Sequence, residues 1–153
     1  MTFRFGERSE ARLKTCHLDL QRVARRTIHH VDFSVLWGHR KKDQQNEEHR
    51  QGRSRLRYPH SRHNTEPSFA LDICPFPMDF ANRETARQCQ LARRRYVLLA
   101  GMFLSTAHVL GVRLRWGGDW AGGLMSPPGS DLLTAYSNQN FDDLGHFELV
   151  EPD

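Results

Sequence analysis

The chain has 153 residues, of which 38% are hydrophobic and 26% charged, a composition typical of one globular domain large enough to bury a core. No apolar run is long enough to form a membrane-spanning helix, because the longest, residues 96–112, contains polar residues and is typical of a buried helix. The first 14 residues lack the apolar segment of a secretory signal, so we expect the mature chain to start in the cytoplasm.

Positive charge is concentrated in the N-terminal part of the chain. The formal net charge is +4, yet all 22 Lys and Arg residues lie at or before Arg115, and seven acidic residues follow it. Such a basic body suits an anionic polymer such as nucleic acid, acidic cell-wall glycan or a membrane surface, although solvated arginines that favour solubility explain any single cluster equally well. The basic run at 91–95 has no interleaved aromatics and belongs to no finger or RNA-recognition motif, so we expect no specific nucleic-acid partner.

Hydrophobic spacing predicts the elements of the first half of the chain. Leu20, Val23, Ala24 and Ile28 recur at helical spacing. Because residues 41–52 are polar all round and end in a glycine, they predict a short exposed helix. In chain order we therefore expect a helix within 13–30, a strand at 32–38, the exposed helix, a turn-rich segment at 52–68 and a strand at 69–73.

The second half predicts one long helix and two further strands. Asn82 is the expected N-cap of the helix, and apolar residues recur at steps of three and four until Gly111 ends it. Strands are expected at 112–116 and 146–150, with a long Gly/Pro/Ser loop at 117–140 between them. A loop of that length in a compact domain commonly borders a functional site.

The three cysteines are predicted to be reduced and buried. Cys16, Cys74 and Cys89 are odd in number and widely spaced, with no Cys-x-x-Cys pair, which argues against a disulfide framework or a cysteine-based zinc knot. None of them lies in a recognisable nucleophile motif.

An aspartate inside an apolar strand raises the possibility of a metal site. A buried carboxylate is costly unless a proton, a cation or a metal compensates it, and alternation places Asp72 beside Ala70 on one face of its strand. The same alternation places His146 and Glu148 together on another strand. With His63 from the preceding turn, the set His63, Asp72 and His146 offers three ligands of the types that zinc accepts, leaving a fourth position for water.

A metal centre of this kind needs a base. Asp143 stands three residues before His146 and is placed to exchange a proton with the attacking water. With nine histidines and 18 acids, however, composition alone allows other sets that include His60, His29 or His30, and ordinary surface or core histidines remain the alternative.

Three segments stand out together in chain order: SRHNTEPSFALDICPFP at 61–77, LRWGGDW at 114–120 and FDDLGHFEL at 141–149. They resemble the zinc peptidases that cleave D-Ala-D-Ala or L-Ala-D-Glu bonds, a family that includes tailed-phage endolysins. The resemblance extends to FGERS, DFSVLWGHR and QGRSRLRYPHSRH in the first 63 residues, so it spans nearly the whole chain. It implies a single α+β domain over 1–153, with a small antiparallel sheet packed on helices, as in the hedgehog/DD-peptidase fold.

The resemblance also implies roles for individual residues. His63, Asp72 and His146 correspond to the family's zinc ligands, and Asp143 to its catalytic acid. Arg40 corresponds to an arginine that holds the substrate and the oxyanion, although without the motif it is one exposed arginine among many.

Two further positions are less constrained. Gln45 is predicted to line the same cleft. Glu148 either orients a ligand imidazole or is a charge on the rim of the site. Some relatives carry an acidic, calcium-loop-like stretch after Gly-Gly-Asp-Trp, but residues 121–130 are poor in carboxylates, so we expect no calcium site.

The function implied is zinc-dependent hydrolysis of peptidoglycan stem peptides, at the L-Ala–D-Glu bond, by a monomeric phage lysis enzyme made in the host bacterial cytoplasm before its release to the wall. A D-alanyl-D-alanine carboxypeptidase or dipeptidase is the alternative within the family. A non-catalytic wall-binding module on the same fold and a basic nucleic-acid binder are alternatives of other classes. The presence of Asp143 argues against a pure binding module, which needs no base beside a ligand.

Overall fold

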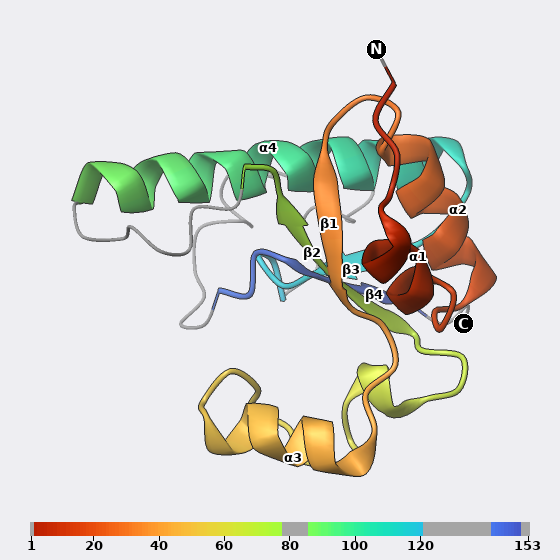
Figure 1. Cartoon of the computed structure of the whole chain (residues 1–153), viewed down its shortest axis with the longest axis vertical. Coiled ribbons are helices and arrows are strands. Elements are labelled where there is room, and N and C mark those ends of the chain that lie inside the picture. The colour runs from red at the N-terminus through yellow and green to blue at the C-terminus, as the bar shows by residue number, and fades with distance from the viewer. Residues whose placement is uncertain (1, 78–85, 121–141, 151–153) are drawn as a thin grey trace, which may run out of the picture.

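The computed structural model describes residues 2–77, 86–120 and 142–150 (Figure 1). The helices are α1 (Glu7–Leu13), α2 (Leu18–Thr27), α3 (Lys42–Arg50), the short 3-10 helix η1 (Arg62–Asn64) and α4 (Ala86–Val109). The strands are β1 (Phe33–Trp37), β2 (Ala70–Pro75), β3 (Leu114–Trp116) and β4 (His146–Leu149).

The four strands form one antiparallel sheet in the order β1-β2-β4-β3. β2 is a central strand, and all six of its residues are buried, so both of its faces are covered. The β2–β4 register pairs Asp72 with His146, and Ala70 with Glu148. The predicted α+β class with a small antiparallel sheet is therefore confirmed.

The hydrophobic core lies between the sheet and the helices α2 and α4. Leu71 and Phe147, which are cross-strand partners, belong to this core together with Phe103 of α4. The rings of Phe103 and Phe147 lie 4.5 Å apart, which fixes α4 against the sheet. Because side chains alternate along a strand, the neighbouring residues Asp72, His146 and Glu148 point to the opposite face.

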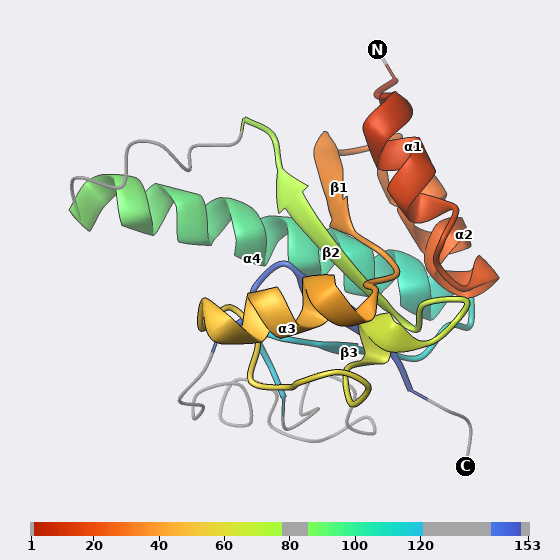
Figure 2. The same ribbon diagram turned by 60° about the horizontal axis from the view of Figure 1, so that its bottom comes forward.

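That opposite face is turned toward η1, which contacts β2, and toward α3. Figures 1 and 2 show α3 and α4 on different sides of β2. A parallel bridge between Cys16 and Ser68 connects the N-terminal helices to the turn before β2. The face that carries Asp72 and His146 is thus turned toward chain segments that carry mainly polar side chains.

The structure corrects several predicted elements. The residues expected to form one N-terminal helix form α2 only from Leu18, where His17 caps the helix by accepting from the Asp19 N–H, and the separate helix α1 precedes it. α3 was expected to be exposed all round, but Gln45 and Glu48 are buried on its inner side. The burial of these two residues was not predicted, because a helix that is polar all round does not show in its sequence which of its sides a neighbouring loop covers.

Other predictions agree with the structure or lie outside it. Cys16 and Cys74 are buried and free, as predicted. The expected N-cap Asn82, the side chain of Cys89 and most of the 117–140 loop lie outside the described residues. No helix in the described part of the chain is long and apolar enough to cross a bilayer.

Candidate metal centre and active site

The structure brings His63, Asp72 and His146 together in one buried cluster. Asp72 Oδ1 lies 3.2 Å from His63 Nε2 and 2.9 Å from His146 Nδ1, and the two imidazole nitrogens are 3.3 Å apart. All three residues are buried, and within the described residues they form the one set of metal-competent side chains whose ligand atoms converge. The three predicted ligands thus meet at a single point.

His63 is oriented by its backbone surroundings. It lies on η1, which Ser61 caps by accepting from the His63 N–H. The His63 Nδ1–H donates to the carbonyl oxygen of Gly38 at 2.7 Å, which leaves the Nε2 lone pair directed at Asp72 and His146. Gly38 must be glycine here, because a Cβ would lie 2.3 Å from Thr15 Oγ1.

His146 is oriented by Glu148 on the same strand. The His146 Nε2–H donates to Glu148 Oε2 at 3.0 Å, so Nδ1 is the nitrogen that faces the cluster. Glu148 Oε1 in turn accepts from Arg115 Nε at 2.9 Å. Of the two roles considered for Glu148, the geometry favours orientation of the ligand imidazole over a charge on the rim.

The electrostatics of the cluster favour a positive charge between its members. Burial lowers the pKa of His146, but hydrogen bonds to Asp72 and Glu148 outweigh this effect and raise the pKa to about 10. Burial dominates at His63 and lowers its pKa. At Asp72 burial acts to raise the pKa, yet the two histidines hold it well below its usual range. The carboxylate therefore stays ionised at a point that attracts a cation.

The donor set fits zinc. Ligand atoms about 2.0–2.1 Å from a tetrahedral zinc ion lie roughly 3.3 Å from one another. The three side-chain N and O atoms of the cluster are 2.9 to 3.3 Å from one another, which is close to that spacing. Two imidazoles and one carboxylate are also the type of three-ligand set that leaves a fourth position open in catalytic sites.

Asp143 lies beside the cluster, in the segment that leads into β4. Its N–H donates to the carbonyl oxygen of Gly117 at 3.0 Å, and its own carbonyl oxygen accepts from the His146 N–H at 3.0 Å. Burial, with the nearby negative charge of Asp72, raises the pKa of Asp143 to about 6. A carboxyl group with a pKa near neutrality can both take up and release a proton.

Arg40 reaches the same cluster from the segment that follows β1. Its guanidinium donates to Asp72 Oδ2, the oxygen that does not face the two histidines, and stacks 5.2 Å over the ring of Trp37. Among the described residues, no group accepts from its buried Nε–H. Arg40 is therefore part of the site rather than one of many exposed arginines.

Gln45 does not lie where the sequence suggested. Its side chain is fully buried, and its Nε2 donates to Ser54 Oγ at 2.9 Å and to the Leu56 carbonyl oxygen at 2.7 Å. The prediction that Gln45 lines the cleft disagrees with this burial. Its two hydrogen bonds connect α3 to the loop that follows this helix.

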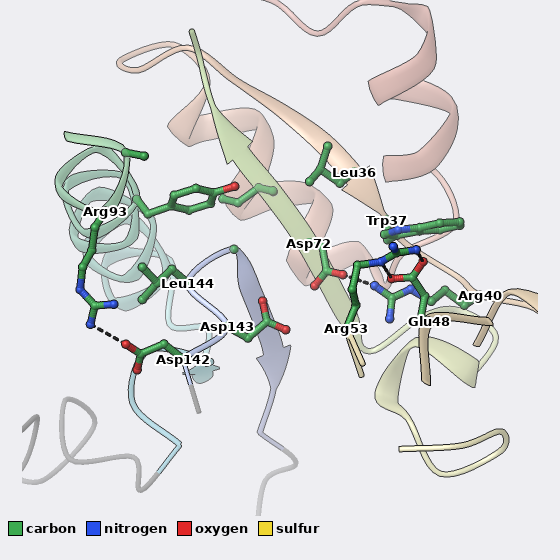
Figure 3. Close-up of a pocket in the computed structure, with 14 residues that line it drawn as sticks. Leu36, Trp37, Arg40, Glu48, Arg53, Asp72, Arg93, Asp142, Asp143 and Leu144 are labelled. Atoms are coloured by element: carbon green, nitrogen blue, oxygen red, sulfur yellow. Dashed lines mark hydrogen bonds and ion pairs between the residues drawn. The ribbon is translucent and has the colours of Figure 1, made fainter. Parts of the chain in front are cut away.

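Two clefts meet at the cluster. The first, here called the α4 cleft, has a volume of about 720 Å³ and runs between α4 and α3, with Leu36, Trp37, Tyr96 and Leu144 among its lining residues. Figure 3 shows the side chains of Asp72, from β2, and Asp143, from the segment before β4, among the residues that line it.

The second, here called the arginine cleft, has a volume of about 470 Å³ and is lined by both histidines of the cluster, Trp120 and several arginines. Arg40, Arg53 and Asp143 line both clefts. A chain molecule that crosses from one cleft to the other therefore passes Asp143 and the cluster of His63, Asp72 and His146.

Two contributions to the site were not predicted. Glu48 of α3 accepts from Arg53 Nη2 at 2.6 Å, and this pair forms a wall of the α4 cleft (Figure 3). Gly117 lets the chain approach Asp143, since a Cβ at this position would lie 2.2 Å from the Asp143 carbonyl oxygen. The Gly-Gly pair in LRWGGDW was a sequence signal for such a close approach.

Comparisons with known proteins agree with one another. The family model described as phage L-alanyl-D-glutamate peptidase matches residues 1–150. The L-alanyl-D-glutamate peptidase of Escherichia phage T5 is 32% identical over 126 residues, covering 78% of this chain and 83% of that protein. The crystal structure of the Serratia marcescens L-Ala D-Glu endopeptidase ChiX matches with a TM-score of 0.67 and 28% identity, covering 97% of this chain and 91% of that one.

Proposed function

This chain belongs to the family of phage L-alanyl-D-glutamate peptidases, and on that premise we propose that it hydrolyses the L-Ala–D-Glu bond of peptidoglycan stem peptides with a zinc ion held by His63, Asp72 and His146. The observation that carries the proposal is the convergence of these three side chains, within 4.8 Å of one another, beside Asp143. The names of the phage T5 and Serratia relatives support the choice of bond.

His63, Asp72 and His146 would hold the zinc ion, which would supply a Lewis acid for the scissile carbonyl and lower the pKa of water to about 7. The chain's own residues prepare that chemistry. The Gly38 carbonyl oxygen and Glu148 fix the two imidazole rings, each with one nitrogen facing inward. The ligand atoms are therefore set in place by hydrogen bonds outside the cluster.

Asp143 acts as the general base and then as the general acid. Its carboxylate takes a proton from the attacking water and later returns that proton to the leaving amine nitrogen. A pKa of about 6 suits both steps, because the group is mostly ionised near neutral pH and can still be protonated.

Arg40 stabilises the negative charge that develops on the carbonyl oxygen during attack. This role is supported by the burial of the Arg40 guanidinium, its place in the lining of both clefts and its ion pair with Asp72. In a site shielded from water, such a fixed positive charge is worth more than it is at the surface.

The biological setting proposed is phage lysis. The relative from Escherichia phage T5 and the basic body of the chain support action on the anionic wall polymer, after synthesis in the host cytoplasm. We propose that the enzyme acts as a monomer with peptidoglycan as its partner.

Digestion of purified peptidoglycan followed by mass analysis of the fragments tests the proposal. New L-alanine carboxyl termini and D-glutamate amino termini are expected, and a metal chelator is expected to abolish them. Release of free D-alanine instead indicates a D-alanyl-D-alanine carboxypeptidase, and chelator-resistant cleavage contradicts the role of zinc.

A further inference from the structure

The two clefts that meet at the metal cluster differ in charge. Five arginines and two carboxylates line the arginine cleft, whereas three arginines and four carboxylates line the α4 cleft. A substrate that crosses both clefts therefore meets a positive environment on one side of the reacting bond and a slightly negative one on the other.

Arg55 and Arg62 give the arginine cleft its distinct character. Both line this cleft but not the α4 cleft, unlike Arg40 and Arg53, which line both. Arg115 also lines only the arginine cleft, but its guanidinium donates to Glu148 and so helps to orient His146.

The backbone that carries these two arginines is fixed. Gln45 donates to Ser54 and Leu56, the two neighbours of Arg55 in the chain. The Arg62 carbonyl oxygen accepts from the Phe69 N–H at 3.1 Å, at the residue just before β2. Arg62 also directly precedes the proposed ligand His63, so its position is coupled to the reaction centre.

The proposed substrate is asymmetric in the same way. Glutamate has two carboxyl groups, and a glutamate that continues the stem peptide through one of them keeps the other free. That free carboxylate lies on the leaving-amine side of the L-Ala–D-Glu bond, within a few bonds of the reacting carbon. The alanine side chain near the reacting carbon is an uncharged methyl group.

We infer that the arginine cleft binds the free carboxylate of the substrate glutamate, and that Arg55 and Arg62 select for it, an inference that rests on the proposed function. A guanidinium matches a carboxylate in charge and in hydrogen-bond geometry. The alanine side then lies in the α4 cleft, where four carboxylates outnumber three arginines and a further negative charge is not favoured.

Two synthetic stem peptides test this assignment, one with the free glutamate carboxylate and one with that group as a carboxamide. The wild-type enzyme is expected to cleave the carboxylate peptide with a kcat/KM about 10- to 100-fold higher, the range expected when a charged hydrogen bond is lost. Arg55→Gln and Arg62→Gln, singly and together, are expected to lose far more kcat/KM on the carboxylate peptide than on the carboxamide peptide, and so to reduce this preference.

Cleavage of the carboxamide peptide also reports that each variant is folded. Arg22→Gln is the matched control, because Arg22 lies on α2 and its exposed side chain pairs with Asp19. Equal cleavage of both peptides by the wild-type enzyme overturns the inference and leaves the proposed function intact. An equal loss of kcat/KM on both peptides in the variants has the same meaning. Failure of the wild-type enzyme to cleave either peptide overturns the proposed function and the inference with it.

Discussion

Asp72 and His146 are direct cross-strand partners on β2 and β4, and Asp72 Oδ1 lies 2.9 Å from His146 Nδ1. Opposed residues of an antiparallel pair have side chains on the same face, so the register itself places these two groups together. His63 then needs only a short turn to bring its Nε2 to the same point.

Replacement of the proposed base separates catalysis from metal binding. Asp143→Asn is expected to lower kcat about 10²- to 10⁴-fold, because the amide cannot accept the proton of the attacking water. Zinc content and the unfolding curve are expected to match the wild type, since Asp143 is not one of the three converging ligands. Asp19→Asn on α2 serves as the control, and full peptidase activity in Asp143→Asn contradicts the assigned role.

The Glu148 carboxylate is expected to increase zinc affinity through His146. Glu148→Gln weakens the hydrogen bond that fixes the His146 ring, so the dissociation constant for zinc is expected to rise about 10- to 100-fold. Competition with a chromogenic chelator measures this constant. Glu47→Gln is the matched control because Glu47 pairs with Arg50 on the outer side of α3, and an unchanged constant in Glu148→Gln speaks against the orienting role.

Gln45 is expected to contribute to stability rather than to direct substrate contact. Gln45→Ala removes buried hydrogen bonds to Ser54 and Leu56, so the free energy of unfolding is expected to fall by about 1–3 kcal/mol. Urea denaturation measures the loss, and Gln90→Ala at an exposed position of α4 is expected to change stability by less than about 0.5 kcal/mol. An unchanged stability with a raised KM in Gln45→Ala supports substrate contact instead.

Gly117 is expected to be irreplaceable because the chain passes so close to Asp143. Gly117→Ala places a Cβ 2.2 Å from the Asp143 carbonyl oxygen, and is expected to cost about 1–3 kcal/mol of stability and to lower activity by displacing Asp143. Gly101→Ala is the contrasting variant. A Cβ there meets nothing within 4 Å, so it is expected to stabilise α4 by about 0.5–1 kcal/mol.

The sequence was informative wherever local periodicity decides the structure. Alternation within two short strands predicted that Asp72 would share a face with Ala70, and His146 with Glu148. In the structure the register of β2 and β4 pairs Asp72 with His146 and Ala70 with Glu148. The long apolar repeat predicted α4 for the same reason. Which histidine completes the set was indicated only by the resemblance to the peptidase family, and which strands pair was not predicted.

Contacts between segments that are distant in the chain could not be predicted from the pattern of polar and apolar residues. α3 is polar throughout, so nothing local shows that Gln45 points inward to the loop after it. In the same way, the contact between Arg40 and Asp72 joins residues 32 positions apart, and only the folded chain reveals it. Sequence indicated the chemistry of the site, and tertiary structure decided which polar residues support it.

Metal analysis of the purified chain tests the central claim most directly. After dialysis against a low concentration of zinc, the wild type and the exposed-site control His108→Ala are expected to retain one zinc ion per chain, and His146→Ala far less, with activity falling in parallel. Full zinc content in His146→Ala, or peptidase activity in a wild-type chain that holds no metal, contradicts the claim that His63, Asp72 and His146 form a catalytic zinc site.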